Sequence, residues 1–156
     1  MNKLFIIAAF LVLCSLFLTA LADNKQDGID YYKKKEQEEG YVKTASGLLY
    51  KIHKAGTGSK HPSKTDKVEV HYEGTLVDGQ VFDSSIKRGQ TITFGLNQVI
   101  PCWTEGLQLA TIGAKLELIC PSEIAYGAQS MSIIKPHSTL IFNVELFAIN
   151  GKKDEL

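Results

Sequence analysis

Residues 67–85 read KVEVHYEGTLVDGQVFDSS, and their pattern is the clearest indication of the fold. Apolar and polar side chains alternate along its first half, where one face consists of Val68, Val70 and Tyr72. A period of two over this length predicts a half-buried strand. The pair Asp78-Gly79 then predicts a tight hairpin turn, and residues 80–84 resume the strand. The stretch therefore predicts two antiparallel strands that share a buried face.

Further strands with the same alternation flank this hairpin. We predict them at residues 48–54, 91–94, 114–120 and 139–149. Residues 101–109 instead have helical spacing, and Pro101 suits the first turn of a helix. Many strands, hairpin turns and a single short helix predict an α+β domain. We expect an antiparallel sheet of about five to six strands that wraps around the helix.

The two ends of the chain carry targeting patterns. Residues 1–22 contain a lysine, an apolar run and a small-residue site, and this order predicts a signal peptide cleaved before Asp23. A membrane anchor is the alternative, but the run is shorter than the roughly 20 apolar residues that a span needs. Residues 153–156 read KDEL, a retrieval signal. Together the ends predict a protein of the endoplasmic reticulum lumen, with the KDEL receptor as a partner and no membrane attachment after cleavage.

Charge patterning divides the rest of the chain into parts. The 17 Lys and Arg residues balance the 17 Asp and Glu residues, so no basic excess favours nucleic acid as a partner. Residues 23–46 form a charged N-terminal arm that we predict to be helical. A solvated helix is favoured there over a docking or dimerising arm. Residues 47–150 form the predicted folded domain, and residues 151–156 form a tail.

The sequence lacks the spacings of a metal, phosphate or acyl-transfer site. Its histidines are scattered, at His53, His61, His71 and His137. We therefore expect neither a metal nor a cofactor. Cys102 and Cys120 remain after signal cleavage, too few for a disulfide scaffold. Buried free thiols are the favoured interpretation, and a single bridge between the two stays open.

Several apolar residues instead gather beside predicted turns, with one carboxylate among them. Asp83 directly follows Phe82, and a carboxylate near apolar walls needs a partner or a function. Trp103, the only tryptophan, follows Val99 and Ile100 at the start of the predicted helix. Each apolar residue alone is typical of a core, whereas Asp83 indicates a site.

Longer strings carry a resemblance to a known family. VHYEGTLVDGQVFDSS (70–85), QVIPCWTEGLQLATIGAKLELICPSEIAYG (98–127) and TLIFNVEL (139–146) resemble the FKBP-type peptidyl-prolyl cis-trans isomerases. The likeness covers about residues 47–150. KTASGLLYKI (43–52) and VIPxWTEGLQL look most like the macrophage-infectivity-potentiator branch, and the targeting ends resemble the secretory members. The resemblance implies a strongly twisted antiparallel sheet curled around one short helix.

The resemblance also implies a pocket that binds proline. Trp103 would form its floor. Walls, rim and cover would consist of Tyr72, Phe82, Ile92, Val99, Ile100, Ile133, Ile134 and Phe142. Tyr126 would donate its hydroxyl to a peptide carbonyl, and the Ile100 N–H would hold the extended chain. Asp83 would lie at the pocket edge and either hold the Tyr72 hydroxyl or act on the rotating carbonyl. The catalytic set would be Asp83, Tyr126, Trp103 and Phe82.

By this resemblance the protein is an enzyme that accelerates rotation about X-Pro bonds. The uncatalysed reaction takes tens to hundreds of seconds and can limit folding. The predicted role is to assist the folding of secretory proteins, with proline-containing polypeptides as clients and macrolides as inhibitors. Cys102 departs from the family, which has glycine there, and Ile92 stands where animal members often carry Phe. The alternative hypothesis is a non-catalytic chaperone or peptide-binding module that uses the same cleft.

Overall fold

The hairpin at residues 67–85 consists of β3 (Lys67–Leu76) and β4 (Val81–Ser84). It is seen here in a computed structural model that describes residues 24–153. The Leu76 N–H donates to the Gln80 carbonyl at 2.9 Å, and Gly79 in the turn has a φ of 85°. Glycine adopts this positive φ without a steric penalty. The signal peptide predicted at 1–22 lies outside the described residues, as does the KDEL tetrapeptide except for its lysine.

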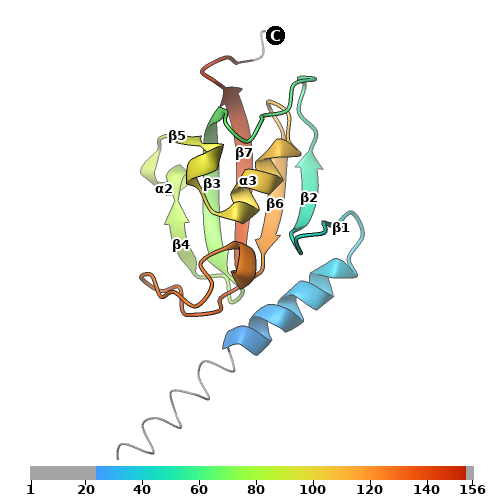
Figure 1. Cartoon of the computed structure of the whole chain (residues 1–156), viewed down its shortest axis with the longest axis vertical. Helices are drawn as coiled ribbons and strands as arrows, with labels where there is room; N and C mark the ends of the chain where they lie inside the picture. Colours follow the sequence, from blue (N-terminus) through green and yellow to red (C-terminus); the bar gives the residue numbers. More distant parts are fainter. Residues whose placement is uncertain (1–23, 154–156) are drawn as a thin grey trace, which may run out of the picture.

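The strands form one antiparallel sheet of seven (Figure 1). The remaining members are β1 (Val42–Lys43), β2 (Leu49–Lys54), β5 (Ile92–Gly95), β6 (Lys115–Cys120) and β7 (Leu140–Ile149). The order is β1-β2-β6-β7-β3-β4, and β5 pairs with β3. The predicted α+β fold is confirmed, with one strand more than expected. The additional strand is β1, whose two residues are too few to show a period of two.

Helix α3 (Pro101–Gln108) crosses one face of the sheet (Figure 1). The helix packs closely on β6, since a Cβ added to Gly106 would lie only 2.8 Å from the methyl groups of Leu118. Two short 3-10 turns, η1 (Leu96–Gln98) and η2 (Ser122–Ile124), and the one-turn α2 (Ser85–Arg88) complete this side. Within the described range, no helix has the length and apolar character needed to cross a membrane.

The N-terminal arm is helical over residues 24–36 and packs against the other face of the sheet. Its Tyr31 and Tyr32 contact a second core cluster, composed of Leu49, Ile119 and Ile141. The Tyr32 hydroxyl also donates to the Gly47 carbonyl at 2.9 Å, and the Lys35 ammonium lies 5.3 Å from the centre of the Tyr41 ring. The favoured interpretation of a purely solvated helix is therefore wrong, because one side of the helix is docked on its own domain.

A disulfide joins Cys102 in α3 to Cys120 at the end of β6. The two Cα atoms are 5.8 Å apart, which suits such a bond. Both residues are fully buried in the main core cluster, which also contains Trp103, Leu107 and Leu118. The favoured interpretation of free thiols is therefore wrong. Spacing in the sequence could not decide this, because the pairing depends on α3 beginning directly over the end of β6.

Candidate functional site

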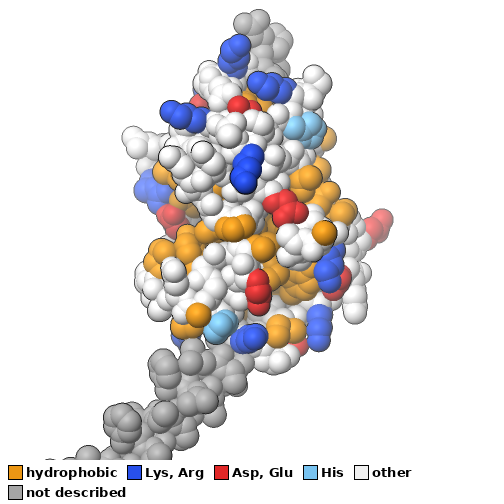
Figure 2. Space-filling model, viewed as in Figure 1, with side chains coloured by type: hydrophobic (Ala, Val, Ile, Leu, Met, Phe, Trp, Pro, Cys, Tyr) orange, Lys and Arg blue, Asp and Glu red, His pale blue; other side chains and the backbone are white. Residues whose placement is uncertain are grey.

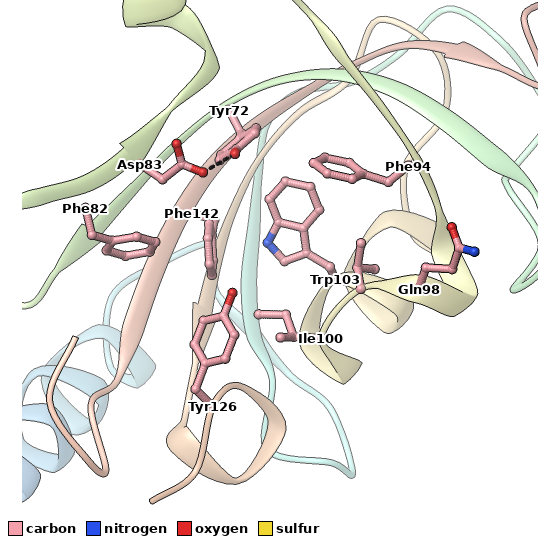
Figure 3. Close-up of a pocket in the computed structure, with 10 residues that line it drawn as sticks. Tyr72, Phe82, Asp83, Phe94, Gln98, Ile100, Trp103, Tyr126 and Phe142 are labelled. Carbon is pink, nitrogen blue, oxygen red and sulfur yellow. Dashed lines mark hydrogen bonds between the residues drawn. The ribbon is translucent and has the colours of Figure 1, made fainter. Parts of the chain in front are cut away.

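An aromatic pocket lies between α3 and the sheet (Figure 3). Its floor is Trp103, which is 4% exposed. Tyr72, Phe94 and Phe142 stand around the indole with ring centroids 5.0, 5.5 and 5.3 Å away and interplanar angles of 89°, 89° and 84°. Edge-to-face packing of this kind is favourable for aromatic rings. The result is a cavity of about 440 Å³ with a flat floor and upright apolar walls.

The pocket opens on the face of the molecule that carries α3. Hydrophobic side chains gather across the middle of this face in the space-filling view (Figure 2). Exposed apolar groups that line a concave site with a few polar groups are typical of a ligand-binding pocket. The polar groups here are Asp83, Gln98 and the hydroxyls of Tyr72 and Tyr126.

A β-bulge explains how two neighbouring residues, Phe82 and Asp83, both face this pocket. Along a regular strand, successive side chains point to opposite faces of the sheet. Here Gly74 pairs with Asp83, but the next residue of β3, Thr75, pairs with Val81, so Phe82 is the additional residue of β4. Such a bulge redirects a side chain. Gly74 makes room for it, since a Cβ there would lie 2.5 Å from the Phe82 ring.

Asp83 is held in a network of hydrogen bonds. The Tyr72 hydroxyl donates to its Oδ2, and Arg88 Nη1 donates to its Oδ1. Arg88 Nη2 also donates to the Tyr72 hydroxyl at 3.2 Å. Burial alone raises the pKa of Asp83, but these bonds outweigh it and leave the pKa below its ordinary value. Asp83 is therefore an ionised group that holds Tyr72, the first of the two roles that the sequence left open.

Tyr126 and the Ile100 amide supply hydrogen-bond donors on the opposite side. The Tyr126 hydroxyl points into the pocket (Figure 3). Burial and the charge of Asp83 both raise its pKa, so it stays protonated and able to donate. Gly127, with a φ of 58°, allows the chain to turn directly after it. The Ile100 N–H precedes the first residue of α3 and has no hydrogen-bond partner within residues 24–153.

Trp103 carries a buried polar atom that is left unpaired. Its Nε1 has no hydrogen-bond partner in the described part of the chain. Figure 3 shows this nitrogen turned toward Phe142, whose ring is nearly perpendicular to the indole. An N–H directed at an aromatic ring makes a weak favourable contact. This contact and the edge-to-face packing of the surrounding rings hold the Trp103 indole in place.

The structure brings most of the predicted site residues together. The predicted members that line the pocket are Tyr72, Phe82, Asp83, Val99, Ile100, Trp103, Tyr126 and Phe142. Ile92, Ile133 and Ile134 do not line it. Ile133 is exposed, and Ile134 is buried in the core, where it bridges to Met131.

Two lining residues, Phe94 and Gln98, were missed by the sequence analysis. Phe94 takes the place predicted for Ile92. Both lie on the same face of β5, so alternation alone could not show which of them reaches Trp103. No sequence signal predicts that Gln98 lines the pocket, because its position depends on the turn η1.

The comparisons with known proteins agree with this geometry. A family model described as FKBP-type peptidyl-prolyl cis-trans isomerase matches residues 58–147. The chain belongs to this family. The FKBP-type isomerase FkpA of Aeromonas hydrophila is 49% identical over 127 residues, which are 81% of this chain and 47% of that protein. The outer membrane protein MIP of Legionella longbeachae is 46% identical over 128 residues, or 81% of this chain and 54% of that one.

A solved structure supports the same assignment of the FKBP fold. The crystal structure of FkpA from Escherichia coli superposes with a TM-score of 0.82 at 36% identity, covering 96% of this chain and 73% of that one. The MIP-like branch inferred from the sequence is confirmed by these relatives. The chain spans about half the length of the curated relatives it matches.

The comparisons correct the predicted location. FkpA and MIP come from bacteria, which have no endoplasmic reticulum, and one of them is named an outer membrane protein. The prediction of the endoplasmic reticulum lumen is therefore wrong. The KDEL receptor as a partner has no support either. The tetrapeptide at 153–156 led to the wrong prediction because a match of four residues carries no structural context against which it can be tested.

Proposed function

We propose that this chain catalyses cis-trans isomerisation of X-Pro peptide bonds in the aromatic pocket over Trp103. The observation that carries the proposal is the indole floor with three perpendicular aromatic walls, matched to donors on one side and a carboxylate on the other. A proline ring is compact and apolar and can pack on the flat indole, and the cavity of about 440 Å³ has room for the ring and its neighbours. Membership of the FKBP-type family supports the same activity.

Rotation about the bond requires the amide to lose its partial double-bond character, against a barrier of roughly 18–20 kcal/mol. A pocket lowers this barrier only by binding the twisted state more strongly than the planar one. The planar amide is the more polar of the two, so apolar walls disfavour it. The Ile100 N–H and the Tyr126 hydroxyl hold the backbone on either side of the proline, and the bond between them is left free to turn.

Asp83 and its partners keep the walls of the pocket in place. Its carboxylate fixes the Tyr72 hydroxyl, and Arg88 balances its charge. Tyr72 in turn packs against the floor. Asp83 therefore acts by holding the Tyr72 wall of the pocket in place.

The partners we propose are proline-containing polypeptides and, as inhibitors, macrolides. Residues 1–22 are proposed to be a signal peptide, residues 23–46 an arm, and residues 47–150 the isomerase domain. Once this signal peptide is removed, the protein is proposed to assist the folding of secretory proteins. The domain assigned by similarity, 58–147, lies inside the proposed one.

The test is a protease-coupled assay on an X-Pro peptide, run together with peptide binding followed by the fluorescence of Trp103, the only tryptophan. We expect acceleration in the unmodified protein and a loss of kcat/KM in Tyr126→Phe and Asp83→Ala. Binding without acceleration would instead show the non-catalytic peptide-binding module. The absence of both binding and acceleration would overturn both hypotheses.

A further inference from the structure

The disulfide connects two segments that each supply part of the pocket. Cys102 directly precedes Trp103, and residues 100–103 supply the floor and the Ile100 amide. Cys120 is the last residue of β6, and residues 121–126 lead from it to the Tyr126 hydroxyl. Figure 3 shows Ile100, Trp103 and Tyr126 around the same space. The bond therefore joins the helix that carries the floor to the strand from which the Tyr126 segment begins.

Hydrogen bonds hold each segment internally but do not join the two. In the floor segment, the N–H of Trp103 donates to the Ile100 carbonyl at 2.9 Å. In the other segment, the Ile124 N–H donates to Pro121 at 3.1 Å, and the Ala125 N–H donates to Ser122 at 3.0 Å. Within residues 24–153, no hydrogen bond or ion pair connects 100–103 to 121–126, and the disulfide is the covalent crosslink between the elements that carry these two segments.

We propose that the Cys102–Cys120 disulfide is a positioning device that sets the distance between the two donors that grip the substrate backbone. This inference rests on the proposed function. The Ile100 N–H and the Tyr126 hydroxyl must reach one peptide at the same time, and catalytic groups lose effect when they are displaced by about 1 Å. The bond is fully buried beside the floor, so the constraint acts on the pocket rather than on the surface.

The test is a double-mutant cycle between the disulfide and the Tyr126 hydroxyl. Its members are the unmodified protein, Cys102→Ala/Cys120→Ala, Tyr126→Phe and the combined variant, measured at a temperature at which all are folded. We expect the loss of the disulfide to lower kcat/KM by about tenfold and to raise KM less than it lowers kcat. We also expect Tyr126→Phe to have a much smaller effect without the disulfide than with it, because an unpositioned hydroxyl contributes little.

The matched control is Leu49→Ala, which weakens the second core cluster on the other side of the sheet. It lowers stability without touching the pocket, so Tyr126→Phe should keep its full effect in that background. Equal effects of Tyr126→Phe with and without the disulfide would overturn the proposal. If the double-alanine variant does not fold, Cys102→Ala/Cys120→Val fills more of the core and takes its place.

Two readouts separate this inference from the proposed function. The same cycle measured as the Kd of a prolyl peptide, by Trp103 fluorescence, tests the positioning even if the protein binds without catalysing. Thiol titration of denatured, unreduced protein that lacks residues 1–22, and with them Cys14, should find no free thiol, and two free thiols would overturn the proposal. If the unmodified protein does not catalyse isomerisation, the proposed function is overturned and the positioning inference is not.

Discussion

Adding one methyl group at Gly74 tests whether the bulge in β4 shapes the pocket. A Cβ at this position would lie 2.5 Å from Cζ and 2.7 Å from Cε2 of Phe82, and 3.0 Å from Cε1 of Phe142. Carbon atoms in contact are about 3.5–4.0 Å apart, so the Phe82 ring must retreat by roughly 1.0–1.5 Å. Both rings are walls of the pocket, so Gly74→Ala moves the walls and leaves the polar groups unchanged.

We expect Gly74→Ala to reduce the free energy of unfolding by about 1–3 kcal/mol, the usual penalty for overpacking. We expect kcat/KM to fall by about ten- to a hundredfold, because the wall is displaced by about an ångström. Urea denaturation and the isomerase assay measure the two effects. Gly74→Ala combined with Phe82→Leu should recover stability but not activity, since the clash is removed together with the ring.

The matched control is Gly28→Ala in the N-terminal helix. Its added Cβ would lie 2.5 Å from Thr139 Oγ1, an equally close approach, and neither residue lines the pocket. Better helix propensity of alanine, by up to about 1 kcal/mol, offsets part of that clash. The control should leave kcat/KM unchanged. If Gly74→Ala keeps full activity and stability, Phe82 is not confined by β3 as described.

Three further predictions concern the polar groups and the disulfide. Tyr126→Phe should lower kcat/KM about three- to tenfold, the value of one neutral hydrogen bond, with little change in the urea midpoint. Asp83 has a pKa below its ordinary 3.8, so its contribution to stability is complete above the unfolded pKa and is lost as pH falls through the folded pKa. The unfolding free energy should therefore decline as the pH falls below the ordinary pKa of 3.8, and less steeply in Asp83→Asn; identical slopes would contradict the network. Removing the disulfide, which closes a sequence separation of 18, should destabilise the protein by about 3 kcal/mol, as measured by urea unfolding.

Much of the fold was predictable because the strands alternate clearly. The apolar face of Val68, Val70 and Tyr72 identified β3, and Asp78-Gly79 identified the turn after it. The two-residue β1 gave no periodic signal. The docking of residues 24–36 could not be predicted either, because Tyr31 and Tyr32 form only a weak apolar stripe whose partners come from distant strands.

Most of the pocket was predictable from motifs, and the failures have geometric causes. Phe94 and Ile92 share a face of β5, so the alternation of side chains cannot say whether the Phe94 ring or the Ile92 side chain reaches Trp103. Ile134 follows an exposed residue but turns into the core through a bridge that no local pattern reveals. The partnership of Asp83 with Arg88 depends on the one-turn helix α2, and the disulfide depends on where α3 meets β6.

The most direct test of the account is the rate of cis-trans exchange in an X-Pro peptide, measured by exchange NMR with catalytic amounts of protein. The unmodified protein should accelerate the exchange, a macrolide should suppress the acceleration, and a folded Trp103→Leu variant should lose most of it. Exchange that stays at the uncatalysed rate with the unmodified protein, or undiminished acceleration by Trp103→Leu, would contradict the claim that this pocket turns the prolyl bond.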